Sequence, residues 1–352
     1  MSFNRKNAFH IDIVNPDDPE GTEPIIEMLG LNDEILLIFK TKGIYEVLTA
    51  EHLDPENKHP DTRHAYQKLY SVGSSHSYVA RMIIQFCDIL DTLKILRPSN
   101  LNLDEIKNYV WDSTKLLLEC ESAFFKFFED TNSLVKKCDD IIEKNKAESH
   151  IPTLPVIEGL RDNCFSFFSN AKKFLVSTYG LLEIFHGMPG HGAKFNKSNE
   201  WVRRKLGESH PLTLMLGTDE TWVRLIAECR NAIEHPDEGL KVSFEGFKLR
   251  AGNKFSAPSW SYDLRKLNLG SKEEMPLLED MDVYLSNLLT LYEELLLLCI
   301  QDIPGFRDVF TIVKTPDEKI NKDRVVMYHL NFKIDWQKGL QKLSADGGIK
   351  GK

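Results

Sequence analysis

The residues best suited to chemistry lie at positions 230–235, RNAIEH, and Pro236 follows them directly. The guanidinium of Arg230 is a permanent cation, and its planar fork suits phosphate oxygens. The imidazole of His235 can give or take a proton. Asn231 can orient either side chain or hold a substrate oxygen. These side chains are suited to cleaving a phosphodiester; the alternative is a helix that simply ends in polar residues.

The spacing of these residues limits what one regular helix can do with them. Successive residues of a helix are rotated by about 100°, so Arg230 and His235 differ by about 140° around the axis. Asn231 and His235 share a face, whereas Arg230 lies at the flank of the apolar stripe. A distorted last turn before Pro236, or a second copy across a two-fold axis, would bring Arg230 and His235 together.

The RN…H pattern followed by Pro236, near the end of a helix in a largely helical chain, resembles the motif of the HEPN superfamily. The resemblance covers roughly residues 100–302, including strands between the last two long helices. It implies a homodimer whose motif helices face each other across a two-fold. It also implies a metal-independent RNA endonuclease that acts as a toxin or defence effector. A cognate antitoxin or regulator would then exist, which the sequence does not identify.

In the mechanism that we expect, His235 acts as base on a ribose 2′-OH or as acid on the leaving 5′-oxygen. Arg230 stabilises charge on the pentacoordinate phosphate, and Asn231 positions His235 or the phosphate. The products are a 2′,3′-cyclic phosphate and a 5′-hydroxyl. Glu228 and Glu234 could tune His235 or face water, and the second interpretation is favoured.

Two other functions are open. One is a non-catalytic HEPN-like helical module that binds nucleotide, RNA or a protein partner. The other is a helical assembly protein in which the motif is a coincidence. A deeply buried Arg230 paired with Glu234 would favour coincidence, whereas a concave dimer cleft holding both motifs would favour the nuclease.

A second group of residues predicts contact with RNA through cations and a stacking aromatic ring. It comprises Lys194, Lys197, Trp201, Arg203, Arg204 and Lys205. The alternative is an ordinary solvated helix face. The formal net charge of −9 argues against a protein that coats long nucleic acids, but not against local grip on a few phosphates.

Composition narrows the class of protein. The chain has 352 residues, of which 42% are hydrophobic, so a sizeable core is expected. It shows neither an apolar signal-peptide core nor a run of 18 uncharged apolar residues, which predicts a cytoplasmic protein without membrane association. The six cysteines form no CxxC pair and are expected to be reduced and buried. No metal or cofactor is predicted.

Hydrophobic periodicity predicts the helices. A seam of period 3.5 marks residues 104–146 and another marks 276–302, as in long packed helices. Further helices are expected at 61–96 with a break near 73–75, after Pro152 and Pro155, at 199–205, and through the motif from a cap at Thr218 or Asp219.

Short β segments are predicted around these helices, and residues 1–33 are expected to be irregular. Residues 35–39 and 44–48 indicate a hairpin, with a short helix pair as the alternative. Residues 242–244 and 247–249 indicate another, and a strand is expected at Trp260 and Tyr262. Residues 309–313 and 325–330 read as strands, and 345–352 as a disordered tail.

The expected fold class is therefore mainly α, a HEPN-like bundle of long helices with small β-hairpin insertions. Residues 1–100 form an N-terminal extension with a possible hairpin and helices. Residues 101–302 form the bundle with a β-hairpin insertion at about 240–262. Residues 303–352 hold short strands and the tail.

Overall fold

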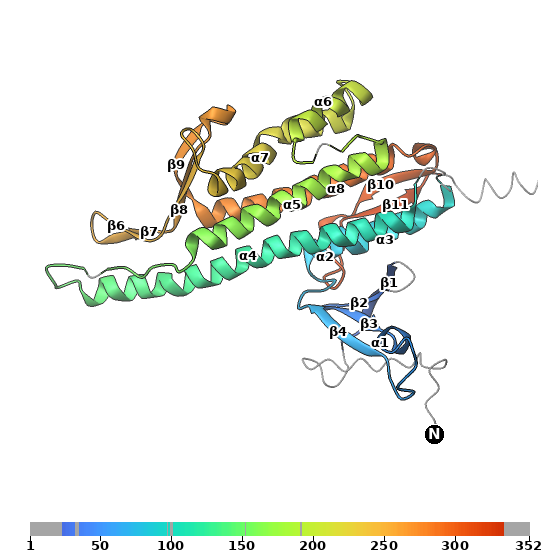
Figure 1. Ribbon diagram of the computed structural model, residues 1–352, viewed down its shortest axis with the longest axis horizontal. Coiled ribbons are helices and arrows are strands. Elements are labelled where there is room, and N and C mark those ends of the chain that lie inside the picture. Colours follow the sequence, from blue (N-terminus) through green and yellow to red (C-terminus); the bar gives the residue numbers. More distant parts are fainter. Residues whose placement is uncertain are drawn as a thin grey trace, which may run out of the picture. The chain divides into compact units, whose positions relative to one another are not determined.

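The computed structural model describes residues 23–31, 35–96, 98, 101–151, 153–190 and 192–333 (Figure 1). Its contacts divide the chain into two compact units. The first unit combines Met1–Thr114 with Ile300–Lys352, and the second is Lys115–Cys299. The predicted disordered tail at 345–352 lies outside the described residues.

The first unit contains a four-stranded antiparallel sheet with the order β1-β2-β3-β4. Its strands are β1 (Ile25–Leu31), β2 (Ile35–Lys40), β3 (Gly43–Leu48) and β4 (Ala65–Tyr70). The predicted hairpin is confirmed, because β2 and β3 pair from Leu36↔Val47 to Lys40↔Gly43. Gly73 packs so closely on this turn that a Cβ there would lie 2.1 Å from the Lys40 carbonyl oxygen.

Short helices and a C-terminal strand pair complete the first unit. They are α1 (Ala50–Leu53), α2 (Ser77–Val79), a π-helical turn (Ala80–Ile84), α3 (Gln85–Leu93), α9 (Phe306–Val309), β10 (Phe310–Lys314) and β11 (Tyr328–Phe332). The buried Gln85 joins α3 to the start of β11, because its Oε1 accepts hydrogen bonds of 2.8 Å from the backbone N–H groups of Met327 and Tyr328. The predicted C-terminal strands are thus present as an antiparallel pair.

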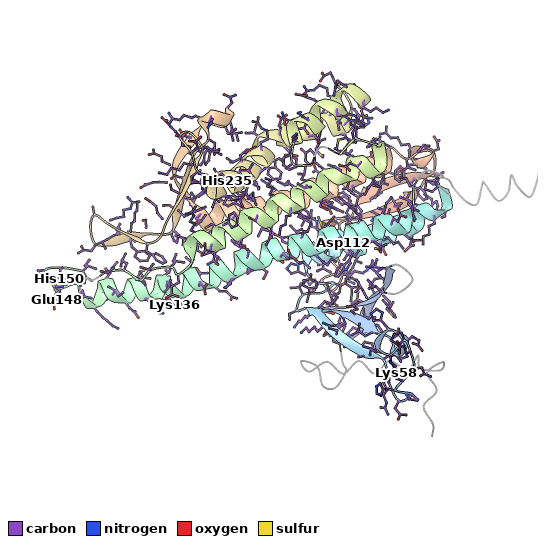
Figure 2. The ribbon with its side chains drawn as sticks, in the orientation of Figure 1. Lys58, Asp112, Lys136, Glu148, His150 and His235 are labelled. Carbon is purple, nitrogen blue, oxygen red and sulfur yellow. The ribbon has the colours of Figure 1, made fainter. Side chains whose placement is uncertain are left out.

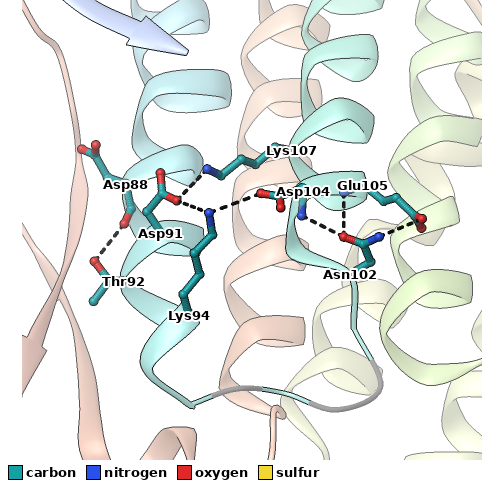
Figure 3. A network of polar contacts seen from close by, with 8 residues as sticks. All are labelled: Asp88, Asp91, Thr92, Lys94, Asn102, Asp104, Glu105 and Lys107. Carbon is teal, nitrogen blue, oxygen red and sulfur yellow. Dashed lines mark hydrogen bonds and ion pairs between the residues drawn. The ribbon is translucent and has the colours of Figure 1, made fainter. Parts of the chain in front are cut away.

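A polar network fixes the start of α4 (Leu103–Lys144) beside α3 (Figure 3). Asn102 caps the helix by accepting the Glu105 N–H at 3.3 Å, and its amide donates to Glu105 Oε1 at 2.8 Å. Two hydrogen bonds thus join the capping residue to the first turn of the helix. The Nζ of the buried Lys107 reaches Asp91 Oδ1 on α3 at 2.6 Å, so its charge is paired.

The second unit is built on long helices, as their seams predict. They are the rest of α4, α5 (Leu160–His186), α6 (Phe195–Leu206), α7 (Pro211–Glu234) and most of α8 (Leu277–Gln301). The Sγ of Cys120 on α4 lies 3.7 Å from the Phe167 carbonyl oxygen on α5. Phe174 on α5 packs on Tyr292 of α8 with ring centroids 5.5 Å apart. These contacts place α5 between two of its neighbours in the core.

Helix α8 is long and apolar enough to cross a membrane by length and composition. However, 61% of its most apolar window is buried within the protein. Leu288, Tyr292 and Leu295 of its predicted seam are fully buried. This burial is what a core helix shows.

The strands of the second unit follow α7. They form a three-stranded antiparallel sheet, β5-β8-β9, and a separate hairpin, β6-β7. Their bounds are β5 (Lys241–Glu245), β6 (Lys248–Arg250), β7 (Lys254–Ser256), β8 (Ser259–Asp263) and β9 (Ser271–Pro276). The buried Trp260 of β8 anchors the sheet to α8, donating from Nε1 to Asp280 Oδ2 at 2.6 Å.

The prediction of a mainly α fold with small insertions was wrong. Of the residues that the structure describes, 54% are helical and 20% lie in strands, with antiparallel sheets of four, three and two strands, so the fold is mixed. The periodicity missed strands that lack apolar alternation. β9 (SKEEMP) is almost wholly exposed, and β1 and β4 are only half-buried, so backbone pairing orders them rather than a buried face.

Three local predictions were also wrong. Residues 61–96 are not helical throughout, because 65–70 form β4. The segments 242–244 and 247–249 do not pair with each other: β5 pairs with β8, and β6 pairs with β7. The motif helix starts before Thr218, because Pro211 opens it and His210 caps it by accepting the Leu212 N–H at 3.3 Å.

Candidate functional site

The motif side chains lie at the C-terminal end of α7, on the second unit (Figure 2). Ile226, Cys229 and Ile233 face the core, and Ala232 is buried with them. This burial holds the last turn of α7 in place. The polar residues of the motif occupy the remaining faces of the turn.

Arg230 and His235 are brought together by Glu234. The Arg230 guanidinium forms an ion pair with Glu234 Oε2, and His235 Nε2 lies 3.3 Å from the same oxygen. The two side chains therefore reach a common point within one chain. The backbone explains this, since His235 leaves the helical path with φ −129° and ψ 69°. The angle of about 140° that a regular helix would set between Arg230 and His235 therefore does not apply here.

The side chains of Arg230 and His235 differ in their exposure to solvent. The His235 side chain is 77% exposed, so its imidazole is open to solvent and to a ligand. The Arg230 side chain is 29% exposed, and its guanidinium carbon lies 5.7 Å from the centroid of the Phe165 ring on α5. That distance is within the range of a cation–π contact. Arg230 is thus held, but it is not deeply buried.

Asn231 is fixed from both ends of its amide. Its Oδ1 accepts a 2.7 Å hydrogen bond from Lys172 Nζ of α5, and its Nδ2 donates to Glu228 Oε2 at 2.9 Å. Burial, and next the charge of Arg230, hold the pKa of Lys172 below its usual range. Glu234 is exposed, as favoured from the sequence, and Glu228 is half-buried, and both also contact motif side chains.

A pocket of about 420 Å³ adjoins this turn. Ala232 and Pro236 line it from the motif, Arg161 from the first turn of α5, and Val242 to Phe244 from β5. The Arg161 guanidinium donates to the Ile233 carbonyl oxygen at 2.8 Å and is thereby tied to the end of α7. Because Ala232 and Pro236 line this pocket, it adjoins the candidate site.

The predicted RNA-contact residues lie on or next to α6. Lys194, Lys197, Arg203, Arg204 and Lys205 are exposed, and Trp201 is half-buried. Helix α6 packs against the N-terminal half of α7, where the Asn199 amide donates to the Leu216 carbonyl and to Glu220 at 3.3 Å. Arg230 lies ten residues after Glu220, which corresponds to about 15 Å along the helix. The two predicted groups are thus separate, and only an RNA of several nucleotides could contact both.

Sequence reasoning missed Lys172, Phe165, Arg161 and Lys241, the last of which also lines the pocket. Their contribution depends on α5 and β5 packing beside α7, which no local spacing reports. The pair of Arg230 and Glu234 was readable as an i,i+4 ion pair. Within the described ranges, no group of three or more His, Cys, Asp or Glu side chains is placed to hold a metal ion.

Comparisons with family models, with curated proteins and with solved structures find no match to this chain.

Proposed function

We propose that this protein is a metal-independent RNA endonuclease of HEPN type. One observation carries the proposal: Arg230 and His235 of one chain contact the same carboxylate oxygen of Glu234. A guanidinium and an imidazole that can share one anionic oxygen can also share the oxygens of a phosphate. This arrangement removes the geometric objection that the helical spacing raises.

In the proposed reaction, the ribose 2′-oxygen attacks phosphorus and the bond from phosphorus to the 5′-oxygen breaks. His235 takes the proton of the 2′-OH, or gives a proton to the leaving 5′-oxygen. Arg230 stabilises the added negative charge on the pentacoordinate phosphate. The products are a 2′,3′-cyclic phosphate and a 5′-hydroxyl. Because each chain brings one motif histidine, a homodimer with facing motifs would supply both the base and the acid.

Asn231 would position the phosphate or the imidazole. The hydrogen bonds from Lys172 and to Glu228 define which end of its amide is oxygen and which is nitrogen. A fixed amide loses little rotamer entropy when it binds substrate. Glu234 would give up Arg230 to the incoming phosphate, which can also accept two parallel hydrogen bonds from a guanidinium.

A non-catalytic helical module is the second candidate, and one observation favours it. Arg230 already has an ion pair with Glu234 and a ring contact with Phe165, which together give it a structural role. Such a module would bind RNA, nucleotide or a partner protein with the same surfaces and without turnover.

The deciding experiment is the cleavage of a mixed-sequence RNA in EDTA by the wild-type chain and by His235→Ala. His150→Ala is the matched control, since His150 is also exposed and lies in the loop after α4, outside the motif (Figure 2). Cleavage by wild type and His150→Ala, but not by His235→Ala, with 2′,3′-cyclic phosphate ends, supports the nuclease. RNA binding without cleavage supports the module. Equal cleavage by all three proteins rejects His235 as the catalytic group.

A further inference from the structure

The pocket beside the motif has a composition that selects for anions. Arg161 and Lys241 line it, and none of its lining residues is acidic. Within the described part of the chain, Lys241 forms no ion pair, and one Arg161 nitrogen is used by the Ile233 carbonyl. A guanidinium has five N–H donors, so the others remain for a ligand. Two cationic side chains that line one pocket suit a phosphate group.

The pocket is also lined by an aromatic ring, that of Phe244. Phe244 is half-buried, and its ring lies against Phe168 with centroids 6.4 Å apart and planes tilted by 34°. Phe168 is fully buried and so holds the Phe244 ring in position. An aromatic ring that lines a pocket and packs on a buried ring can stack on a nucleobase, whichever base it is.

The strand that carries Phe244 also offers hydrogen-bonding groups. β5 is the edge strand of its sheet and pairs with β8 alone. An edge strand leaves alternate peptide N–H and C=O groups without a strand partner. The hydroxyl of Ser243, which lines the pocket, adds a donor and an acceptor. These groups could read the polar edge of a base.

We infer that this pocket binds one nucleotide of the RNA substrate, next to the scissile phosphate. The base lies against Phe244 and the edge of β5, and the phosphate of that nucleotide lies between Arg161 and Lys241. Pro236 lines the pocket directly after His235, so the bound nucleotide adjoins the proposed reaction centre. The volume of about 420 Å³ lies within the range of small-ligand sites. This inference rests on the proposed function for its choice of RNA as the source of the nucleotide.

Binding is tested apart from cleavage, in the full chain carrying His235→Ala. The probes are the four nucleoside 3′-monophosphates and inorganic phosphate, titrated by isothermal calorimetry. Nucleotides are expected to bind at least about tenfold more tightly than phosphate, because the base adds a stacking contact. Arg161→Gln and Lys241→Gln should each lower the affinity for the nucleotides and for phosphate by about tenfold, the effect of losing one charge-assisted hydrogen bond.

Two further variants separate the contact with the base from the contact with the phosphate and serve as a control outside the pocket. Phe244→Leu keeps the apolar contact with Phe168 but removes the stacking ring. It therefore lowers the affinity for the nucleotides by about tenfold and leaves the affinity for phosphate unchanged. Lys254→Gln, an exposed lysine on β7 outside the pocket, leaves both affinities unchanged. Thermal unfolding confirms that each variant is folded before its affinity is compared.

The same variants are then made in the wild-type background and assayed for RNA cleavage. The inference predicts that the pocket variants raise KM more than they lower kcat. If wild type cleaves RNA but Arg161→Gln and Lys241→Gln bind nucleotides as wild type does, the pocket proposal is overturned and the nuclease proposal stands. If these two variants abolish nucleotide binding but wild type does not cleave RNA, the nuclease proposal is overturned and the pocket is supported as a site for free nucleotide. Nucleotides that bind no tighter than phosphate overturn the base site.

Discussion

The Nζ of Lys172, in the middle of α5, donates a 2.7 Å hydrogen bond to Oδ1 of Asn231, in the last turn of α7. It connects two helices across 59 residues of sequence and places a second cation beside Arg230. The proposed catalytic turn therefore depends on a residue outside the motif. Lys172 acts on it by positioning Asn231.

Replacing Lys172 by methionine should lower kcat by about tenfold with a smaller change in KM, because Asn231 loses its fixed orientation at similar side-chain volume. Lys172→Arg, which keeps a donor, should recover part of the loss. Steady-state cleavage of a defined RNA measures both parameters. Unchanged kcat in Lys172→Met would limit Lys172 to a structural role.

The depressed pKa of Lys172 predicts a pH dependence of stability. The unfolded chain binds this proton more strongly than the folded chain, so the stability of wild type should rise with pH in the range just below and up to the ordinary lysine value of 10.5. Lys172→Met lacks this contribution. The free energy of unfolding of wild type, relative to the variant, should therefore increase over that range in urea titrations. A constant difference would contradict the lowered pKa.

Glu234→Gln should tighten RNA binding by about threefold, because the carboxylate that competes with phosphate for Arg230 loses its charge. His235 keeps a neutral neighbour, so cleavage persists. Fluorescence anisotropy with a labelled RNA measures the affinity. Glu238→Gln, an exposed glutamate three residues beyond His235, is the matched control. Weaker binding by Glu234→Gln would mean that Glu234 orients Arg230 for substrate.

Neutralising Arg203, Arg204 and Lys205 of α6 together with glutamine should weaken RNA binding and flatten its salt dependence. Each lost phosphate contact reduces the slope of log K against log salt by about 0.7 for a single strand. The control is the same triple change at Lys136, Lys137 and Lys144, which are exposed on α4. An equal loss in both triple variants would show that only net charge matters.

All six cysteines are free and buried, so a thiol reagent should label none of them in the native protein and all six after unfolding.

Burial raises the pKa of the Cys87 thiol to about 12, against an ordinary 9.0. The folded chain therefore holds this proton more strongly, and its contribution to stability is complete below pH 9 and lost as pH rises towards 12. In Cys87→Ala that part of the pH dependence should be absent from urea titrations.

Trp260→Phe should destabilise the second unit by about 1–3 kcal/mol, because it removes the hydrogen bond to Asp280 and leaves that carboxylate without its donor. Trp222→Phe is the control, since Trp222 bonds Asp219 within its own helix and is only half-buried. Urea unfolding followed by circular dichroism compares them. Equal small losses would show that the link between β8 and α8 contributes little.

The helices were predictable because their signal is local and repeated. Residues 104–146 and 276–302 carry an apolar seam at every third or fourth position, and the structure has α4 and α8 there. The hairpin of β2 and β3 was predictable for a similar reason, as two apolar runs flank a short polar turn with Gly43. In each case neighbouring residues along the chain decide the conformation.

The sequence by itself determined that Arg230, Asn231 and His235 end a helix, and that α4, α5 and α8 are long. Only the tertiary structure decided that β5 pairs with β8 rather than with its neighbour β6, since strand pairing depends on which partner the packed chain presents. It also decided what surrounds the motif. Lys172 and Arg161 reach it because α5 packs beside α7, and contacts between residues so far apart in sequence leave no periodic trace.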